Sequence, residues 1–401
     1  MTGPALRAAH GQRPVDRLHR QSAFAVQHRA DEMARSGREI FQLGLGEPDL
    51  PTPSYIVTAM ADSARRGDTG YTQPAGDPAV RSRLARHYSE RLGHPLGPNN
   101  ILLVPGSNMA LHFALLALAE PGDEVLIPDP GYPVYAELTR LADAVPVGYR
   151  LRAENGFQPD IADLAALLNA RTRLIVLNSP HNPTGTSLPA GFGPRLAELV
   201  GSYDCHVLRD EAYRSLNFDG VDADRELSAL PADRVIVAET LSKSHAMCGW
   251  RAGVVLVPDA LAADFAVLMT NTNCCMPAFV QQALVPALTS TESQRVAAGY
   301  AAVHRERRDL TVRRLRAMPG LSLVAPTGSL YAFPDIRATG LSDGEFAQRL
   351  LEETGVVVMP GHIFGTGGQG YVRVAFTRSP QQLTAAFDRM HLFLQRTMEE
   401  R

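Results

Sequence analysis

Short apolar runs alternate with helix-like stretches between Ile101 and Val257. The runs are Ile101–Val104, Glu124–Ile127, Arg173–Leu177, Cys205–Leu208, Val235–Ala238 and Gly253–Val257. Each is too short for a helix, and strands buried on both faces are typically continuous apolar segments. Between them, residues 110–119, 132–141, 161–168 and 189–200 have the apolar spacing of amphipathic helices. The alternation predicts a doubly wound, mostly parallel sheet with helices on both faces.

The remainder of the chain has a different pattern. A helical stretch from about Pro277 to Arg316 precedes short strand-like pieces near Ser322, Leu330, Val356 and Val372 and helices near Phe346 and Leu383. A further helix is expected from Val15 to Ser36, ending at Gly37. We therefore expect an α/β protein with three parts: an N-terminal arm (1–50) associated with the small domain, a large domain (51–290) and a small α+β domain (291–401).

The residues that follow the apolar runs are candidates for a binding site, because ligands bind outside the carboxyl ends of the strands in open α/β sheets. Gly106-Ser107-Asn108 follows the first run and suits a phosphate, although Ser and Asn are also common N-caps. A rigid turn at Asp129-Pro130-Gly131 follows the second run and could hold the Tyr132 ring against a flat ligand. A core tyrosine beside a turn is the competing interpretation.

Two further strand ends carry polar side chains. The heptapeptide from Ser179 to Gly185 fixes an irregular backbone and directs the Asn182 amide into the predicted cleft. Asp210 directly follows an apolar run and precedes Tyr213 by three positions. A buried carboxylate needs a cationic or hydrogen-bonding partner, such as a protonated ring nitrogen. A helix N-cap is the alternative role for Asp210.

Lysine occurs once in the chain, at Lys243, although Lys and Arg together number 39. Arginine supplies the remaining positive charge, so surface charge does not require lysine here. Unlike arginine, a desolvated lysine can become a nucleophilic amine and form a Schiff base. The Thr240-Leu241-Ser242-Lys243 segment after the fifth run therefore indicates covalent chemistry, with a stray surface lysine as the competing explanation.

Composition excludes several classes of protein. The net charge of −3 makes nucleic acid an unexpected partner. No apolar run is long enough to cross a membrane and no signal peptide is evident, so we expect a cytoplasmic protein that does not associate with membranes. The four cysteines have neither disulfide-framework nor zinc spacing.

Taken together, these motifs resemble the class I/II aminotransferases of fold type I, in the aspartate aminotransferase superfamily. The resemblance extends from Leu43 to about Phe376 and implies pyridoxal 5′-phosphate (PLP) as the cofactor. It implies that Lys243 forms the Schiff base and that Asp210 pairs with the pyridine nitrogen. Asn182 and Tyr213 would hydrogen-bond the phenolic oxygen, and Tyr132 would stack on the ring. The implied catalytic residues are Lys243, Asp210 and Tyr213.

The resemblance also assigns the remaining site residues. Those that would bind the phosphate are Ser107, Thr240, Arg251 and the backbone at Gly106 and Asn108. Tyr71 would reach the phosphate of a neighbouring subunit, which implies a homodimer with shared active sites. Arg373 would hold the substrate α-carboxylate together with Asn182, and Gly46 would belong to a loop that covers the substrate.

The implied reaction moves an amino group between an L-amino acid and a 2-oxo acid. Another PLP reaction on this scaffold, such as β/γ-elimination or amino-acid oxidation, is an alternative with the same lysine and aspartate. Gly340-Leu341-Ser342-Asp343-Gly344 fits a serine-hydrolase pattern, but Ser342 and Glu345 also form a helix-capping box. The G-x-G-x-x-G segment Gly365–Gly370 precedes a predicted strand and so does not suit a dinucleotide. A noncatalytic binding module would be expected to lack Lys243, Asp210 or Arg373.

Overall fold

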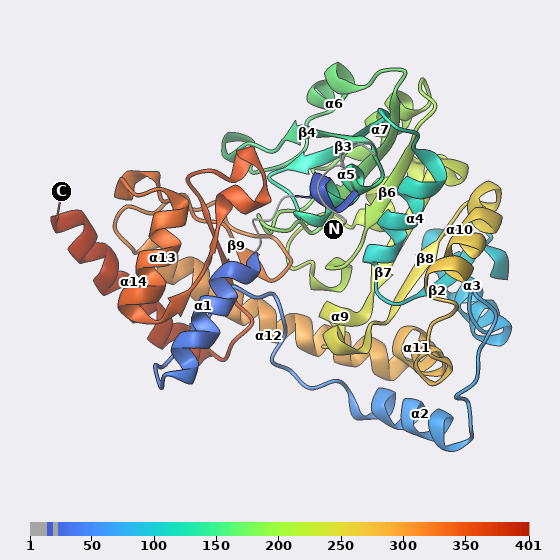
Figure 1. Cartoon of the computed structure of the whole chain (residues 1–401), viewed down its shortest axis with the longest axis horizontal. Coiled ribbons are helices and arrows are strands. Elements are labelled where there is room, and N and C mark those ends of the chain that lie inside the picture. The colour runs from blue at the N-terminus through green and yellow to red at the C-terminus, as the bar shows by residue number, and fades with distance from the viewer. Residues whose placement is uncertain (1–13, 19–22, 401) are drawn as a thin grey trace, which may run out of the picture.

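The computed structural model describes residues 14–18 and 23–400, in which a large sheet with flanking helices adjoins a smaller C-terminal region (Figure 1). The large sheet has seven strands in the order β2-β8-β7-β6-β5-β3-β4. These are β2 (Ile101–Val104), β3 (Glu124–Asp129), β4 (Val145–Arg150), β5 (Thr172–Asn178), β6 (His206–Asp210), β7 (Val235–Thr240) and β8 (Gly253–Leu256). Only β8 runs antiparallel to its neighbours β2 and β7. The predicted doubly wound, mostly parallel sheet is confirmed.

Helices cover both faces because neighbouring strand residues point to opposite sides. Val125 and Ile127 of β3 pack with α4 (Asn108–Leu118), α5 (Val134–Leu141) and α10 (Asp259–Thr272). Leu126 of the same strand packs with α6 (Ile161–Leu167) and α7 (Phe192–Val200) on the other face. That second face continues over β2, β7 and β8, which α3 (Pro78–Leu92) and α11 (Ala278–Thr289) cover. The core therefore lies on both sides of the sheet.

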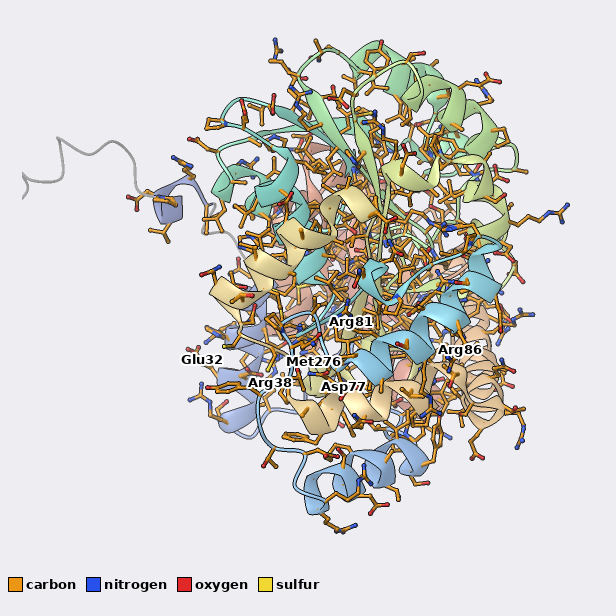
Figure 2. All side chains as sticks on the ribbon, turned by 90° about the vertical axis from the view of Figure 1, so that its right-hand side faces the viewer. Glu32, Arg38, Asp77, Arg81, Arg86 and Met276 are labelled. Carbon is orange, nitrogen blue, oxygen red and sulfur yellow. The ribbon has the colours of Figure 1, made fainter. Side chains whose placement is uncertain are left out.

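A side-chain cap marks where α3 begins. Asp77 precedes α3, and its Oδ1 accepts hydrogen bonds from the backbone N–H groups of Ala79 (2.8 Å) and Val80 (3.0 Å). Figure 2 shows Asp77 at the start of this helix, with Arg81 and Arg86 farther along it. Such a cap satisfies backbone donors that the helix leaves without partners. α2 (Ser54–Arg65) packs against α11 at the same edge of the molecule.

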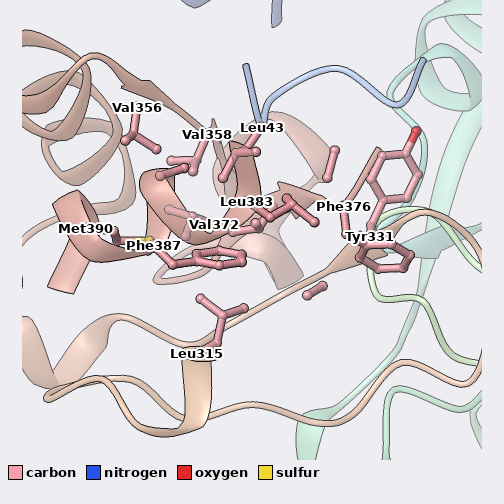
Figure 3. Close-up of a cluster of buried hydrophobic side chains, with 14 of the residues drawn as sticks. Leu43, Leu315, Tyr331, Val356, Val358, Val372, Phe376, Leu383, Phe387 and Met390 are labelled. Atoms are coloured by element: carbon pink, nitrogen blue, oxygen red, sulfur yellow. The ribbon is translucent and has the colours of Figure 1, made fainter. Parts of the chain in front are cut away.

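The C-terminal region is a smaller α+β unit. Its elements are α12 (Thr291–Arg316), β9 (Tyr331–Ala332), α13 (Asp343–Thr354), β10 (Val356–Val357), β11 (Met359–Pro360), β12 (Val372–Ala375) and α14 (Pro380–Glu399). β11, β12 and β9 form an antiparallel sheet, and β1 (Phe41–Gln42) pairs in parallel with β10. Leu315, Val372 and Phe387 belong to the buried cluster that joins these elements (Figure 3).

Some expectations about elements were wrong. The stretch from Pro277 to Arg316 is two helices separated at Ser290, whose hydroxyl accepts from Ser293 N and caps α12. The described part of the expected 15–36 helix is a 3₁₀ turn at Pro14–Arg17 and α1 (Ala23–Arg35), while residues 19–22 lie outside the described residues. Ser322 makes an isolated bridge to Asp335, not a strand. The domain boundaries after residues 50 and 290 stay predictions, and residues 1–13 of the arm are not described.

Two classes of feature are absent from residues 14–18 and 23–400. None of the helices there has both the length and the apolar character needed to cross a bilayer. Nor does any group of three or more His, Cys, Asp and Glu side chains there form a metal site. The four cysteines are free thiols.

Candidate active site

A cavity of about 450 Å³ lies at the carboxyl ends of the parallel strands of the large sheet. Ten of the predicted site residues line it: Ser107, Asn108, Tyr132, Asn182, Asp210, Tyr213, Thr240, Lys243, Arg251 and Arg373. Gly46 and Gly106 contact these residues through their backbones, as described below. Tyr71 does not line the cavity, and its side chain is 88% exposed. The fold therefore brings together all but one of the predicted residues.

Lys243 lies on α9 (Leu241–Ser244), a short turn of helix directly after β7. Its Nζ donates a hydrogen bond to the Gly46 carbonyl oxygen at 2.8 Å and lies 3.7 Å from Cys248 Sγ. Thr240 caps the turn by accepting from Ser242 N. The end of β7 and the Thr240 cap thus fix the backbone position of Lys243, while its amine contacts the N-terminal segment at Gly46.

Asp210 ends β6 and accepts two hydrogen bonds. Tyr135 of α5 donates its hydroxyl to Oδ2 at 2.6 Å, and the backbone N–H of Ala212 donates to Oδ1 at 3.1 Å. Burial raises the pKa of the Asp210 carboxyl, and the bonds from Tyr135 and Ala212 partly oppose this rise. Sequence reasoning missed Tyr135, although its spacing three positions after Tyr132 in a predicted helix places both rings on one face.

At the start of α4 the backbone approaches Arg251 closely. A Cβ on Gly106 would lie 2.2 Å from Arg251 Nη2, and Gly106 has a φ of +94° that favours glycine. Ser107 is the N-cap residue of α4, and Arg251 also donates to the Cys248 carbonyl at 3.1 Å. The helix N-terminus and the guanidinium create a positive region beside free backbone N–H groups.

Arg373 of β12 is buried and held on several sides. Its Nη1 donates to Asn182 Oδ1 at 2.9 Å, and its Nη2 donates to the Gly44 carbonyl at 2.7 Å. The guanidinium lies between the rings of Tyr331 and Phe364, 4.2 and 4.7 Å from their centroids. Within the described residues, its buried Nε finds no hydrogen-bond partner. Because Arg373 lines the cavity, its guanidinium could pair with a carboxylate bound there.

Tyr331 is a second residue of the cavity that the sequence analysis did not assign to the site, and it lies on β9. Its hydroxyl hydrogen-bonds the Tyr213 hydroxyl at 2.9 Å. A Cβ on Gly46 would lie 1.8 Å from the Tyr331 oxygen, so only glycine fits at position 46 in this arrangement. Gly46 therefore contributes to the site in two ways. Its carbonyl accepts a hydrogen bond from Lys243, and the absence of a side chain leaves room for the Tyr331 hydroxyl.

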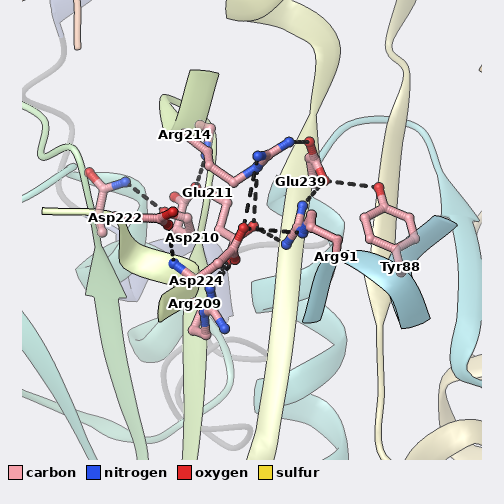
Figure 4. A network of polar contacts seen from close by, with 11 residues as sticks. Tyr88, Arg91, Arg209, Asp210, Glu211, Arg214, Asp222, Asp224 and Glu239 are labelled. Carbon is pink, nitrogen blue, oxygen red and sulfur yellow. Dashed lines mark hydrogen bonds and ion pairs between the residues drawn. The ribbon is translucent and has the colours of Figure 1, made fainter. Parts of the chain in front are cut away.

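A buried ionic network lies behind the strand ends (Figure 4). Glu211 directly follows Asp210 and Glu239 directly precedes Thr240, so strand alternation directs both glutamates to the opposite side of the sheet. Their partners are Arg91, Arg209, Arg214 and Tyr88. Burial alone would raise the pKa of Glu239, but the charges of Arg214 and Arg91 outweigh it and lower the pKa to about 2.

The two competing motifs have structural roles away from this chemistry. Ser342 is the N-cap of α13, and its hydroxyl accepts from Glu345 N at 3.2 Å. The Gly365–Gly370 segment includes a 3₁₀ turn (Thr366–Gly368) and leads into β12, so it does not open an α-helix after a strand. Neither motif lines the cavity.

Comparison with known proteins identifies the family. Residues 38–390 match the model for aminotransferase class I and II. The chain is 35% identical to an aspartate aminotransferase of Pyrococcus horikoshii, over 91% of this chain and 93% of the relative. It is 37% identical to an arginine–pyruvate transaminase of Pseudomonas aeruginosa, over 92% and 94%. The structure of Thermus thermophilus aspartate aminotransferase with maleate is 30% identical, with a TM-score of 0.90 covering 98% of this chain and 100% of that one. The chain belongs to the class I and II aminotransferase family.

Proposed function

We propose that this protein transfers an amino group between an L-amino acid and a 2-oxo acid, using pyridoxal 5′-phosphate attached covalently through Lys243. One observation carries the proposal: the only lysine, the buried carboxylate of Asp210 and the guanidinium of Arg373 line one cavity. These groups suit, in turn, covalent attachment, a ring nitrogen and a substrate carboxylate.

The residues present fit this cofactor at both ends. Asp210 would meet the ring nitrogen, and Tyr132 would lie against the ring, with Asn182 and Tyr213 at its phenolic oxygen. At the other end, Ser107, Thr240, Arg251 and the backbone at Gly106 and Asn108 would bind the phosphate. The close approach of Gly106 to Arg251 supports this, because a side chain at position 106 would collide with the guanidinium.

When bound, the cofactor supplies an electron sink that makes the substrate Cα proton removable. The ε-amine of Lys243, set free when the substrate amine replaces it on the cofactor, would take and return that proton, a role worth about 10² to 10⁴ in rate. The Gly46 carbonyl, 2.8 Å from Nζ, orients the amine. Arg373 would hold the α-carboxylate through its guanidinium, while Asn182 keeps the guanidinium in place. The loop that contains Gly46 covers the substrate.

The assembly belongs to the same proposal. Tyr71 is almost fully exposed in the single chain, and we assign it to the phosphate site of a second subunit in a homodimer. Each site would then need both subunits. The cytoplasmic location stays a prediction from the sequence.

Absorbance spectroscopy of the purified protein tests this function. We expect the protein to have a yellow absorbance band that depends on PLP and is bleached by borohydride. Borohydride should fix the reduced cofactor to the one peptide that contains Lys243. An amino donor should convert the band and release the matching 2-oxo acid. The variant Lys243→Arg keeps the charge and should lose at least about 10²-fold in turnover.

Three results would count against the proposal. A colourless protein that does not take up PLP would overturn the cofactor. Pyruvate with ammonia as products would favour elimination, and hydrogen peroxide would favour oxidation. In either of these last two cases the cofactor would stand and the transfer reaction would be lost.

A further inference from the structure

A short stretch of chain near the N-terminus contacts both side chains that the proposed function places on the substrate. The Gly44 carbonyl oxygen accepts a hydrogen bond from Arg373 Nη2 at 2.7 Å, and the Gly46 carbonyl oxygen accepts one from Lys243 Nζ at 2.8 Å. We call residues 44–49 the carbonyl segment. Because two of its carbonyls bind the guanidinium and the amine, the position of this segment influences how far apart these two groups lie.

An ion pair fastens the carbonyl segment at Asp49, its last residue. Asp49 Oδ1 accepts from Arg307 Nη1 at 2.7 Å, and Oδ2 accepts from Nη2 at 3.4 Å. Two parallel bonds of this kind fix the direction of the carboxylate as well as its distance. The Arg307 side chain is only 6% exposed and that of Asp49 is 25% exposed, so solvent screens this pair less than it screens a surface pair.

Arg307 also binds the stretch of chain that carries Arg373. It lies on α12, and its Nη1 donates to the Thr377 carbonyl oxygen at 3.0 Å. Thr377 follows the end of β12, and its Oγ1 donates to the Leu45 carbonyl oxygen at 3.3 Å. One buried arginine therefore joins α12 to the carbonyl segment and to the end of β12.

The chain beyond Asp49 has ties of its own. The Pro51 carbonyl oxygen accepts from the Tyr300 hydroxyl of α12 at 2.5 Å, and the Thr52 hydroxyl donates to the Ala246 carbonyl oxygen at 2.8 Å. These bonds do not involve the Asp49 side chain, so a variant without the ion pair keeps them. We therefore expect such a variant to fold and to lose mainly the position of the carbonyl segment.

We propose that the ion pair of Asp49 with Arg307 positions the carbonyl segment, and that this segment in turn sets the separation between the reactive amine and the carboxylate-binding guanidinium. The inference rests on the proposed function, which assigns the amine to the Cα proton and the guanidinium to the carboxylate on the same carbon. Asp49 and Arg307 are positioning residues, because neither is among the described residues that line the cavity and both act through the backbone of the carbonyl segment.

Replacing Asp49 tests the positioning role. The assay follows conversion of the PLP band by the common L-amino acid that converts the wild type fastest. Asp49→Ala should disturb the amine and the guanidinium together, so we expect the maximum rate to fall about tenfold and the half-saturating concentration to rise about tenfold. Asp49→Asn keeps the size of the side chain and one acceptor oxygen, and both changes should be smaller.

The matched control is Asp219→Ala. Asp219 pairs at 2.6 Å with Arg308, the residue next to Arg307 on α12, and the Arg308 side chain is 9% exposed. The control thus removes an aspartate from a buried arginine of the same helix and leaves the contacts of the carbonyl segment in place. Both kinetic values should stay within about twofold of wild type, because sites without shared partners act independently.

Hydrogen exchange follows the carbonyl segment without any turnover. We expect the backbone amides of residues 43–49 to exchange at least about tenfold faster in Asp49→Ala than in wild type, because the segment opens more often without its anchor. Asp219→Ala should match wild type over these residues, and β7 should exchange alike in all three proteins. Unchanged exchange in Asp49→Ala would overturn the anchoring role.

These measurements separate the possible failures. If the wild-type protein does not bind PLP or transfer amino groups, the proposed function fails and the positioning role fails with it. If the wild type does both, but Asp49→Ala keeps its maximum rate and half-saturating concentration, only the positioning role fails. A lower rate at unchanged half-saturation would also overturn that role, because a smaller fraction of intact protein gives the same result. If Asp49→Ala does not fold, Asp49→Asn decides, and wild-type kinetics and exchange in that variant overturn the role.

Discussion

At the scale of residues, Asp210 shows how one partner can decide a charge state. The carboxylate is buried, which raises its pKa, and the Tyr135 hydroxyl at 2.6 Å stabilises the ionised form. A neutral Asp210 could not form an ion pair with a protonated ring nitrogen. Tyr135, which also lines the cavity, would therefore support the proposed cofactor site through its bond to Asp210.

Replacing Tyr135 with phenylalanine should raise the Asp210 pKa further and weaken PLP binding. We expect the loss to be about tenfold in Kd, since hydrogen bonds to charged groups contribute about 1.5–3 kcal/mol. The loss should grow as the pH is lowered, because burial raises the pKa of Asp210 and protonation of its carboxyl then increases. Titration of PLP at several pH values measures both effects.

A suitable control is Tyr149→Phe, which removes a buried hydroxyl that donates to the Val176 carbonyl away from the cavity. The control should leave PLP affinity unchanged. Equal affinity in Tyr135→Phe and wild type would contradict the role of Tyr135.

Sequence reasoning located the residues whose chemistry is visible in the chain itself. Lys243 stands out by count, and Asp210 and Asn182 stand out by position after apolar runs. Tyr135 and Tyr331 did not stand out, because a tyrosine in a helix or strand is ordinary until its hydroxyl is placed beside Asp210 or Tyr213. Cavity residues that act through tertiary contact are the ones that sequence patterns miss.

At the scale of elements, the ionic network fastens α3 to β6 and β7 behind the site. Arg91 of α3 donates to Glu211 at 2.6 Å and to Glu239 at 2.7 Å. Asp210 directly precedes Glu211, and Thr240 directly follows Glu239. The network therefore holds the ends of the two strands that position Asp210 and Lys243.

The variant Glu239→Gln should lower the free energy of unfolding by about 3–5 kcal/mol at pH 7, because Arg91 and Arg214 each lose a buried carboxylate partner. The Glu239 pKa is lowered from 4.5 to about 2 in the folded state, so its stabilisation is complete above about pH 4.5 and is lost as the pH falls toward 2. The difference between wild type and variant should shrink over that range. Urea unfolding from pH 2 to 7 measures it.

The control for this variant is Glu353→Gln, which breaks a more exposed pair with Arg349 on α13. Such i,i+4 pairs contribute about 0.3–0.5 kcal/mol, so this change should be small at every pH. A Glu239→Gln protein as stable as the control would show that the network does not stabilise the fold.

The sequence analysis correctly predicted the strands that are buried on both faces of the sheet. β2, β3 and β5 are covered on both faces and are continuous apolar runs, which made them easy to find. β4 was not predicted, because it is an exposed edge strand whose sequence contains Pro146 and Gly148. The break at Ser290 was missed, although the Ser290 hydroxyl caps α12 and so marks where that helix begins.

At the scale of the whole molecule, the exposed Tyr71 gives a test of assembly. In a homodimer with shared sites, Tyr71→Phe should weaken PLP binding about tenfold or more without changing the dimer, since only a hydrogen bond to phosphate is lost. Sedimentation should give twice the chain mass for wild type and variant. A monomer that binds PLP with full affinity would contradict the shared site.

The long helix α12 has a consequence for how the two halves can move. It contacts α11 and α9 of the large sheet region and also α14 and β9 of the C-terminal region. Near its start, Ser293 Oγ hydrogen-bonds His245 Nε2 at 2.8 Å, two residues from Lys243. A rotation of the C-terminal region must therefore bend this 26-residue helix or pivot it near Ser290. Through this bond, α12 would transmit a rotation of the C-terminal region, which carries Arg373, to the helical turn that carries Lys243.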